Sequence, residues 1–122
     1  MPERVIKYDL KREFLSGERC FINELLSEIG PDGLSIALAR VEPGATTVRH
    51  ALTKVTERYL IIEGKGKVEV GELEPTDVSF GDVVSIPPGV DQRISNLGSS
   101  DLLFLCICTP KFTADCYMNR EE

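Results

Sequence analysis

The stretch that decides the fold reads Gly44-Ala-Thr-Thr-Val-Arg-His50-Ala-Leu-Thr-Lys-Val-Thr-Glu57-Arg-Tyr-Leu-Ile-Ile-Glu-Gly64, and it contains the only histidine of the chain. Histidine and carboxylate side chains are ligands that hold Mn, Fe, Ni or Zn in proteins. His50 and Glu57 lie between two glycine turns in this stretch. They therefore offer half of a metal site, and the remaining ligands must come from elsewhere in the chain.

A second stretch, Gly81-Asp-Val-Val-Ser-Ile-Pro-Pro-Gly-Val-Asp-Gln92-Arg-Ile-Ser-Asn96, passes from an apolar strand through a Pro-Pro-Gly turn to Gln92. Together the two stretches resemble the cupin motifs G-x5-H-x-H-x3,4-E-x6-G and G-x5-P-x-G-x2-H-x3-N. Leu52 and Gln92 replace histidines at two metal-ligand positions. The other marked positions match at the correct spacing, namely Gly44, His50, Glu57, Gly64, Gly81, Pro87, Gly89 and Asn96. The resemblance implies an all-β fold, the double-stranded β-helix or cupin jelly-roll barrel.

The alternation of residues along the whole chain also predicts an all-β fold, independently of the resemblance. Many short alternating segments separated by turn residues, with no long helical pattern, are typical of an all-β sandwich or barrel. We predict a single domain over residues 1–122. It consists of an N-terminal arm (1–16), a barrel (17–109) and a C-terminal tail (110–122) with one helical turn over residues 114–118.

Two expected strands carry small side chains on one face. In residues 34–42, strand alternation places Ser35, Ala37, Ala39 and Val41 together. Small residues inside a barrel leave room for a ligand, but they also suit a tightly packed sheet, and both readings stay open. Cys106 and Cys108 share one face of the apolar strand 102–108. We expect them, like Cys20 and Cys116, to be reduced thiols, with this pair buried.

Composition limits the class of protein. With 122 residues, of which 42% are hydrophobic, the chain can bury one core. Its net charge of −6, with scattered basic residues, disfavours nucleic acid and anionic membranes as partners. We find no signal-peptide pattern and no apolar run of the roughly twenty residues that span a bilayer, so we expect a cytoplasmic protein.

The cupin resemblance implies that His50, Glu57 and Gln92 hold a divalent metal, Mn, Fe, Ni or Zn. Tyr59 shares the strand face of Glu57 and is expected to line the same pocket. Each residue also has a structural reading. His50 then bonds a neighbour, Glu57 is solvated and paired with Arg49 or Arg58, and Tyr59 is an aromatic core residue.

Three functions are compatible with these residues. The first is a metal-dependent enzyme of dioxygenase, decarboxylase or isomerase type, acting on a small organic or sugar-like substrate. The alternative is a non-catalytic ligand-binding or sensor module with a degenerate metal site, and a third is an interaction protein with a relic pocket. The resemblance also implies a homodimer, with residues 5–14 as an arm that pairs with the partner. Fold alone does not fix the ligand.

Overall fold

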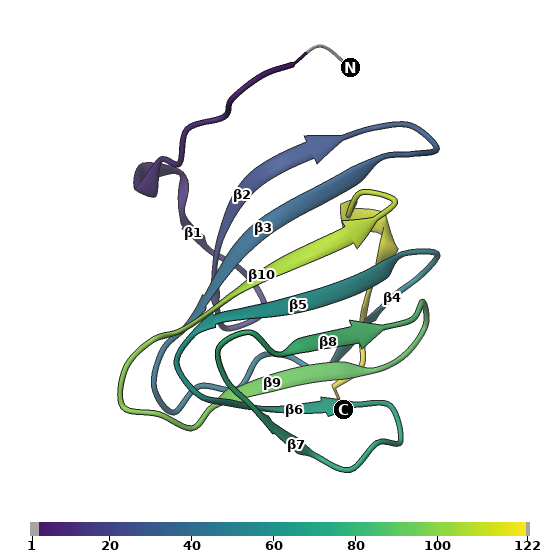
Figure 1. The fold of residues 1–122 in the computed structure, drawn as a ribbon. Helices are drawn as coiled ribbons and strands as arrows, with labels where there is room; N and C mark the ends of the chain where they lie inside the picture. Colours follow the sequence, from purple (N-terminus) through teal and green to yellow (C-terminus); the bar gives the residue numbers. More distant parts are fainter. Residues whose placement is uncertain (1–2, 122) are drawn as a thin grey trace.

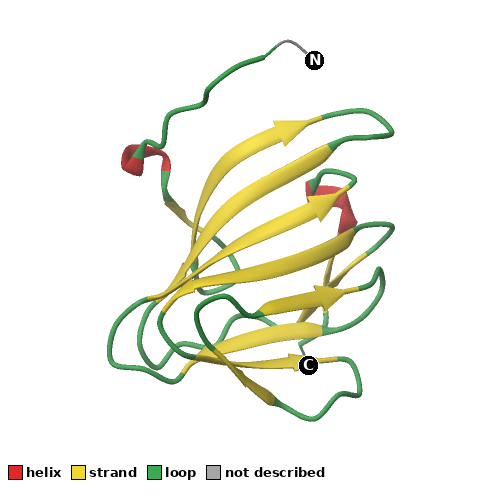
Figure 2. Cartoon of the chain, viewed as in Figure 1, coloured by secondary structure: helices red, strands yellow, loops and turns green. Residues whose placement is uncertain are grey.

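The computed structural model describes residues 3–121 and consists of two antiparallel β-sheets that face each other (Figures 1 and 2). The six-stranded sheet has the order β1-β2-β3-β10-β5-β8, and the five-stranded sheet has the order β11-β4-β9-β6-β7. From β3 to β6 and from β7 to β11 consecutive strands alternate between the sheets, so the chain winds around a common core. The predicted all-β barrel is confirmed.

The elements are short, as the frequent turn residues predict. The strands are β1 (Phe14–Leu15), β2 (Phe21–Glu28), β3 (Leu34–Val41), β4 (His50–Leu52), β5 (Thr56–Glu63), β6 (Gly66–Val70), β7 (Thr76–Val78), β8 (Val83–Ile86), β9 (Gln92–Asn96), β10 (Leu102–Thr109) and β11 (Tyr117–Asn119). Two 3₁₀ turns, η1 (Leu10–Arg12) and η2 (Ala114–Cys116), accompany them. No helix of the described residues is long and apolar enough to cross a membrane.

Strand alternation decides which side chains form the core. In β5, Glu57, Tyr59 and Ile61 are buried between the sheets, as their spacing predicts. In β10, Leu102 and Phe104 are buried on the inner face, opposite Val41 and Ala39 of β3. These apolar contacts close one end of the space between the sheets.

The motif residues that carry no chemistry make turns. Gly64 has φ 92°, and a Cβ atom there would lie 2.8 Å from the carbonyl oxygen of Asp101, so only glycine fits without strain. Buried Asn96 donates its amide to the carbonyl oxygens of Val41 and Ser100, each at 2.8 Å. These contacts explain why the turns of this fold need a glycine at position 64 and an asparagine at position 96.

Of residues 46–52, only His50–Leu52 form a strand, β4, because Val48 N donates to the Glu18 carbonyl oxygen outside the sheet. Two local expectations need refinement. The tail forms a turn at η2, as expected, but it then continues as strand β11, paired with β4. The arm is interrupted by η1, and its last residues pair with β2 of the same chain, while the pairing of the arm with a partner chain stays a prediction.

One row of side chains on the outer face of the six-stranded sheet is apolar. Cross-strand register aligns Leu38, Leu105, Leu60 and Val83 in one row across β3, β10, β5 and β8. The alternate residues of these strands point inward, so this row faces away from the core. Val83 is 63% exposed. A contiguous apolar row of this kind is typical of a protein–protein contact.

We expect a second copy of the chain to cover this face. Leu60→Lys and Leu105→Lys each place a charge in the middle of the row and should convert a dimer to a monomer with an intact barrel. A stable interface needs about 800 Å² per partner, which a face of four strands can supply. Sedimentation velocity checks the result, with Leu97→Lys, on an exposed turn, as the control. A wild type that is already monomeric at micromolar concentration would contradict the expectation.

Candidate functional site

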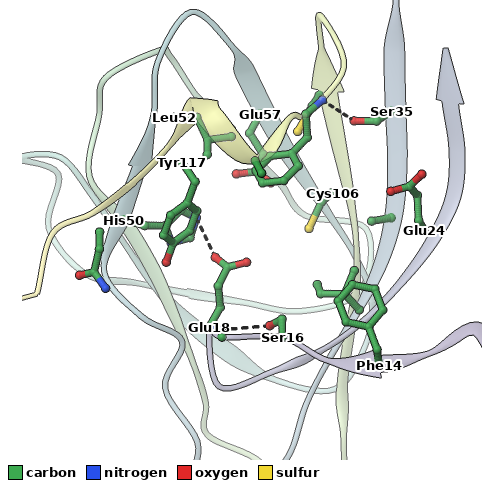
Figure 3. A pocket seen from close by; sticks show the side chains of 17 residues that line it. Phe14, Ser16, Glu18, Glu24, Ser35, His50, Leu52, Glu57, Cys106 and Tyr117 are labelled. Atoms are coloured by element: carbon green, nitrogen blue, oxygen red, sulfur yellow. Dashed lines mark hydrogen bonds and ion pairs between the residues drawn. The ribbon is translucent and has the colours of Figure 1, made fainter. Parts of the chain in front are cut away.

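A cavity of about 430 Å³ lies between the two sheets, within the size range of small-molecule sites (Figure 3). Its wall combines residues of the N-terminal segment, both sheets and the C-terminal segment. The lining residues are Phe14, Ser16, Gly17, Glu18, Ile22, Glu24, Ser35, Ala37, His50, Leu52, Glu57, Cys106, Cys108, Phe112, Ala114, Tyr117 and Asn119.

The cavity exists because the inner face of β3 and β10 changes from large to small side chains. Ala37 lies opposite Cys106, and Ser35 lies opposite Cys108. The small residues of β3 thus do both things that the sequence left open. Ser35 and Ala37 leave room for a ligand on the cavity wall, whereas Ala39 and Val41 pack tightly in the core.

His50 is 5% exposed, and both its ring nitrogens have partners. Nδ1 lies 2.8 Å from the carbonyl oxygen of Val48, which can only accept, so Nδ1 carries a proton. Nε2 lies 3.2 Å from Oε2 of Glu18. This is an ion-pair distance when the imidazole ring is protonated. His50 and Glu18 therefore face each other as a candidate acid–base pair on the cavity wall.

Burial raises the pKa of Glu18, while the charge of His50 acts in the opposite direction. The loop before β2 presents this residue to the cavity. Glu18 N donates to Ser16 Oγ at 3.2 Å, and the Glu18 carbonyl oxygen accepts from Val48 N at 3.1 Å. The same short segment thus fixes both the backbone and the carboxylate of Glu18 against β4.

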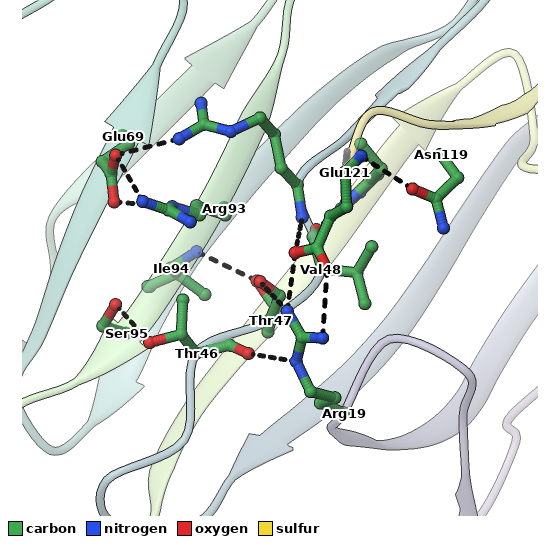
Figure 4. Close-up of polar contacts among 12 residues, drawn as sticks. Arg19, Thr46, Thr47, Val48, Glu69, Arg93, Ile94, Ser95, Asn119 and Glu121 are labelled. Atoms are coloured by element: carbon green, nitrogen blue, oxygen red, sulfur yellow. Dashed lines mark hydrogen bonds and ion pairs between the residues drawn. The ribbon is translucent and has the colours of Figure 1, made fainter.

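A polar network ties this loop to the C-terminal segment (Figure 4). The Arg19 guanidinium binds both carboxylate oxygens of Glu121, at 2.6 and 3.2 Å, and donates to the Thr46 carbonyl oxygen at 2.9 Å. Glu121 also accepts from Arg49 N at 3.0 Å. The network holds β11 beside β4, where Tyr117 stacks on His50 with 5.0 Å between ring centroids.

Glu57 is 7% exposed, so the solvated reading of this residue is wrong. Burial raises its pKa, while the charge of His50 and the nearby Gln92 and Cys108 side chains act in the opposite direction. Among the described residues its Oε1 atom has no hydrogen-bond partner. Arg49 pairs with Glu69 and Arg58 donates to Thr109, so neither arginine neutralises the Glu57 carboxyl.

Gln92 and Tyr59 lie behind the cavity wall rather than on it. Gln92 is the cross-strand partner of His50, is fully buried, and is not among the lining residues. Its Oε1 atom accepts a hydrogen bond from the Tyr59 hydroxyl, and its Nε2 atom has no partner in the described part of the chain. Tyr59, 3% exposed, packs against Phe104 with centroids 4.6 Å apart. Arg93, the residue after Gln92, points to the opposite face and binds Glu69 at 2.7 Å.

All four cysteines are free, but Cys106 and Cys108 line the cavity instead of merely filling the core. Burial raises the pKa of both thiols, and it raises the pKa of Cys20 to about 11. Since the thiolate is the nucleophilic form, these side chains act as small apolar lining groups.

A metal centre of the expected kind requires His50, Glu57 and Gln92 to direct donor atoms at one point. The only Gln92 atom able to bind a cation, Oε1, is used by Tyr59, and an apolar residue, Leu52, lies on the wall beside His50. Over residues 3–121 no three His, Cys, Asp or Glu side chains are grouped closely enough to hold a metal. The donor set does not fit such a centre, and we derive no reaction step through one.

Comparison with known proteins agrees with this architecture. The family model of the cupin domain matches residues 37–108, more than half of the chain. The chain belongs to the cupin family, whose members often bind metals. It is 32% identical over 114 residues to the uncharacterised protein MJ1618 of Methanocaldococcus jannaschii, covering 90% of each chain.

Two solved structures illustrate the shared fold. A conserved protein with a double-stranded β-helix domain from Klebsiella pneumoniae superposes with a TM-score of 0.78 at 17% identity, covering 98% of this chain and 100% of that one. The capsular polysaccharide assembling protein CapF of Staphylococcus aureus gives a TM-score of 0.76 at 24% identity over 90% of this chain. The present chain spans only 34% of CapF, and both likenesses concern the fold alone.

Sequence reasoning missed Glu18, Phe112 and Tyr117, which all lie outside the motif stretches. No local pattern marks them, because their segments reach the cavity only through contacts with β4 and β3. Phe112 N, for example, donates to Ser35 Oγ at 2.9 Å. The one available signal for Glu18 was a carboxylate in a Gly-containing turn, which is a common surface feature.

The raised pKa of Glu57 predicts a pH-dependent effect of Glu57→Gln. The folded state holds this proton more tightly than the unfolded state, so Glu57 costs stability as pH rises from about 4.5 through its folded pKa. Glu57→Gln should therefore raise the free energy of unfolding by roughly 1–3 kcal/mol near pH 8 and change it little near pH 5. Urea denaturation at both pH values tests this, with exposed Glu63→Gln as the control. Equal destabilisation at both pH values would refute the assignment.

The donor set also predicts the metal content. Wild-type protein dialysed against trace Zn or Mn should retain none in stoichiometric amount. The double substitution Leu52→His, Gln92→His restores the motif histidines beside His50 and should retain about one metal with a higher melting temperature. Adding His50→Ala should abolish that gain. One tightly held equivalent in the wild type, by elemental analysis, would show that the argument from Gln92 is mistaken.

Proposed function

We propose that this cupin binds a small organic molecule in the cavity between its sheets, using wall side chains and no metal centre of the cupin type. The observation that carries the proposal is Glu57, a buried carboxyl on the cavity wall whose Oε1 lacks a partner in the described chain. A buried, unsatisfied carboxyl costs stability, and binding sites retain such groups because a ligand satisfies them.

The remainder of the wall supports a ligand of mixed character. Phe14, Phe112 and Tyr117 offer aromatic surface, while Ser35 and Asn119 offer polar groups. A mostly apolar cavity with a few convergent polar groups is the usual form of a small-molecule site. This is the ligand-binding alternative of the sequence analysis, with Glu57 and the Glu18–His50 pair in place of the metal.

A second candidate is a proton-transfer enzyme of isomerase or lyase type. It is favoured by two separate proton-carrying groups on one wall, namely Glu57 and the Glu18–His50 pair. An acid and a base on two sides of a bound molecule can move a proton between two of its atoms. NMR spectra of a bound compound, recorded before and after incubation, distinguish turnover from binding alone.

A cavity-filling substitution tests the proposal. Ala37 lies on the wall opposite Cys106, so Ala37→Phe places a ring inside the cavity. In a fragment screen by ligand-observed NMR, we expect compounds that bind the wild type, compete with one another, and lose at least about tenfold in affinity to Ala37→Phe.

Ser85→Phe, on the outer face of β8, adds the same ring away from the cavity and is the matched control. It should leave the affinities unchanged. Fragments that bind Ala37→Phe as well as the wild type, or a screen without any competing compounds, would contradict the proposal.

A further inference from the structure

The charge of the cavity wall restricts the ligand further. Three carboxyl residues, Glu18, Glu24 and Glu57, line the cavity together with one histidine, and its described lining contains no lysine or arginine. The nearby arginines are directed elsewhere, since Arg19 binds Glu121, and Arg49 and Arg93 bind Glu69 (Figure 4). An anionic ligand would therefore meet repulsion and find no counter-charge except His50.

Both ring nitrogens of His50 already have partners. Its Nε2 faces Glu18 at 3.2 Å and its Nδ1 faces the Val48 carbonyl oxygen, so neither nitrogen is free to receive a carboxylate or phosphate. Glu18 is likewise used in this pair. Glu24 is exposed on β2 at the rim of the cavity. Glu57 is thus the one deeply buried wall carboxyl that, in the described chain, has no ion-pair partner and keeps one oxygen, Oε1, without a hydrogen bond.

The aromatic part of the wall suits the same kind of ligand. Phe14, Phe112 and Tyr117 come from different segments and line one cavity. Aromatic faces attract cations as well as apolar groups, and desolvation strengthens that attraction. A cavity of about 430 Å³ accommodates an ammonium or amidinium head together with an apolar body.

We propose that the ligand is a small organic cation, an amine or amidine on an apolar body, whose charged head pairs with the Glu57 carboxylate. The inference rests on the proposed function, because it names the ligand class of the same cavity. A cation supplies the counter-charge that Glu57 lacks, in a setting where a charge-assisted hydrogen bond is strongest. A neutral alcohol of the same size leaves the buried carboxylate without one.

Three probes of nearly equal size test the charge of the head group. They are 2-phenylethylamine, 2-phenylethanol and 3-phenylpropanoate, measured by calorimetry with the full chain at one near-neutral pH and low salt. The amine should bind roughly tenfold or more tightly than the alcohol, and the carboxylate should not bind measurably. Glu57→Gln should remove the preference for the amine and keep the affinity for the alcohol within about threefold of the wild-type value. The control, exposed Glu63→Gln, should keep the wild-type order of affinities.

Each outcome decides the inference. If the alcohol or the carboxylate binds as tightly as the amine, or if Glu57→Gln keeps the preference, the cation assignment is wrong and the cavity remains a small-molecule site. If none of the three probes binds the wild type, the assignment is also wrong. The proposed function is then judged separately, by whether fragments compete for the cavity and are displaced by Ala37→Phe.

Discussion

The structure depends on a change of side-chain size along the paired strands β3 and β10. At one end Val41 faces Leu102 and Ala39 faces Phe104 across the ladder, and these side chains bridge the roughly 10 Å between packed sheets. At the other end the partners are Ala37 with Cys106 and Ser35 with Cys108, which are too short to reach the opposite sheet. The same ladder therefore makes a packed core and, a few residues on, a cavity.

The cavity concentrates ionisable groups where water is scarce. Burial raises the pKa of both Glu18 and Glu57, so each holds a proton more readily than a surface carboxyl. Glu18 is compensated by His50, and the stacked Tyr117 helps to enclose the pair. The Oε1 atom of Glu57, in contrast, has no partner within the described chain. Glu57 therefore costs stability in the folded protein, and such a cost is typical of residues at functional sites.

The two positions that depart from the cupin motif, Leu52 and Gln92, both lie next to His50. Gln92 lies directly across from His50 in the sheet, where it bonds Tyr59, and Leu52 follows His50 on the cavity wall. Glu18, from the loop before β2, faces His50 Nε2. The motif positions at Leu52 and Gln92 thus carry a wall residue and a core residue in an unaltered barrel, since the glycine and asparagine turns of the motif are present.

The sequence by itself determined the all-β barrel and the buried face of β5, because these follow from strand alternation and from turns that only glycine or asparagine makes well. The cupin resemblance added the expectation that His50 and Glu57 lie on one cavity, as they do. Tertiary structure decided the rest. Tyr117 reaches His50 through the β11–β4 ladder, and Glu18 reaches it through the backbone contact of its loop with Val48. Gln92 turned its oxygen to Tyr59 because that hydroxyl is buried and must find an acceptor. A local sequence pattern does not predict these contacts, since they depend on which groups folding brings together.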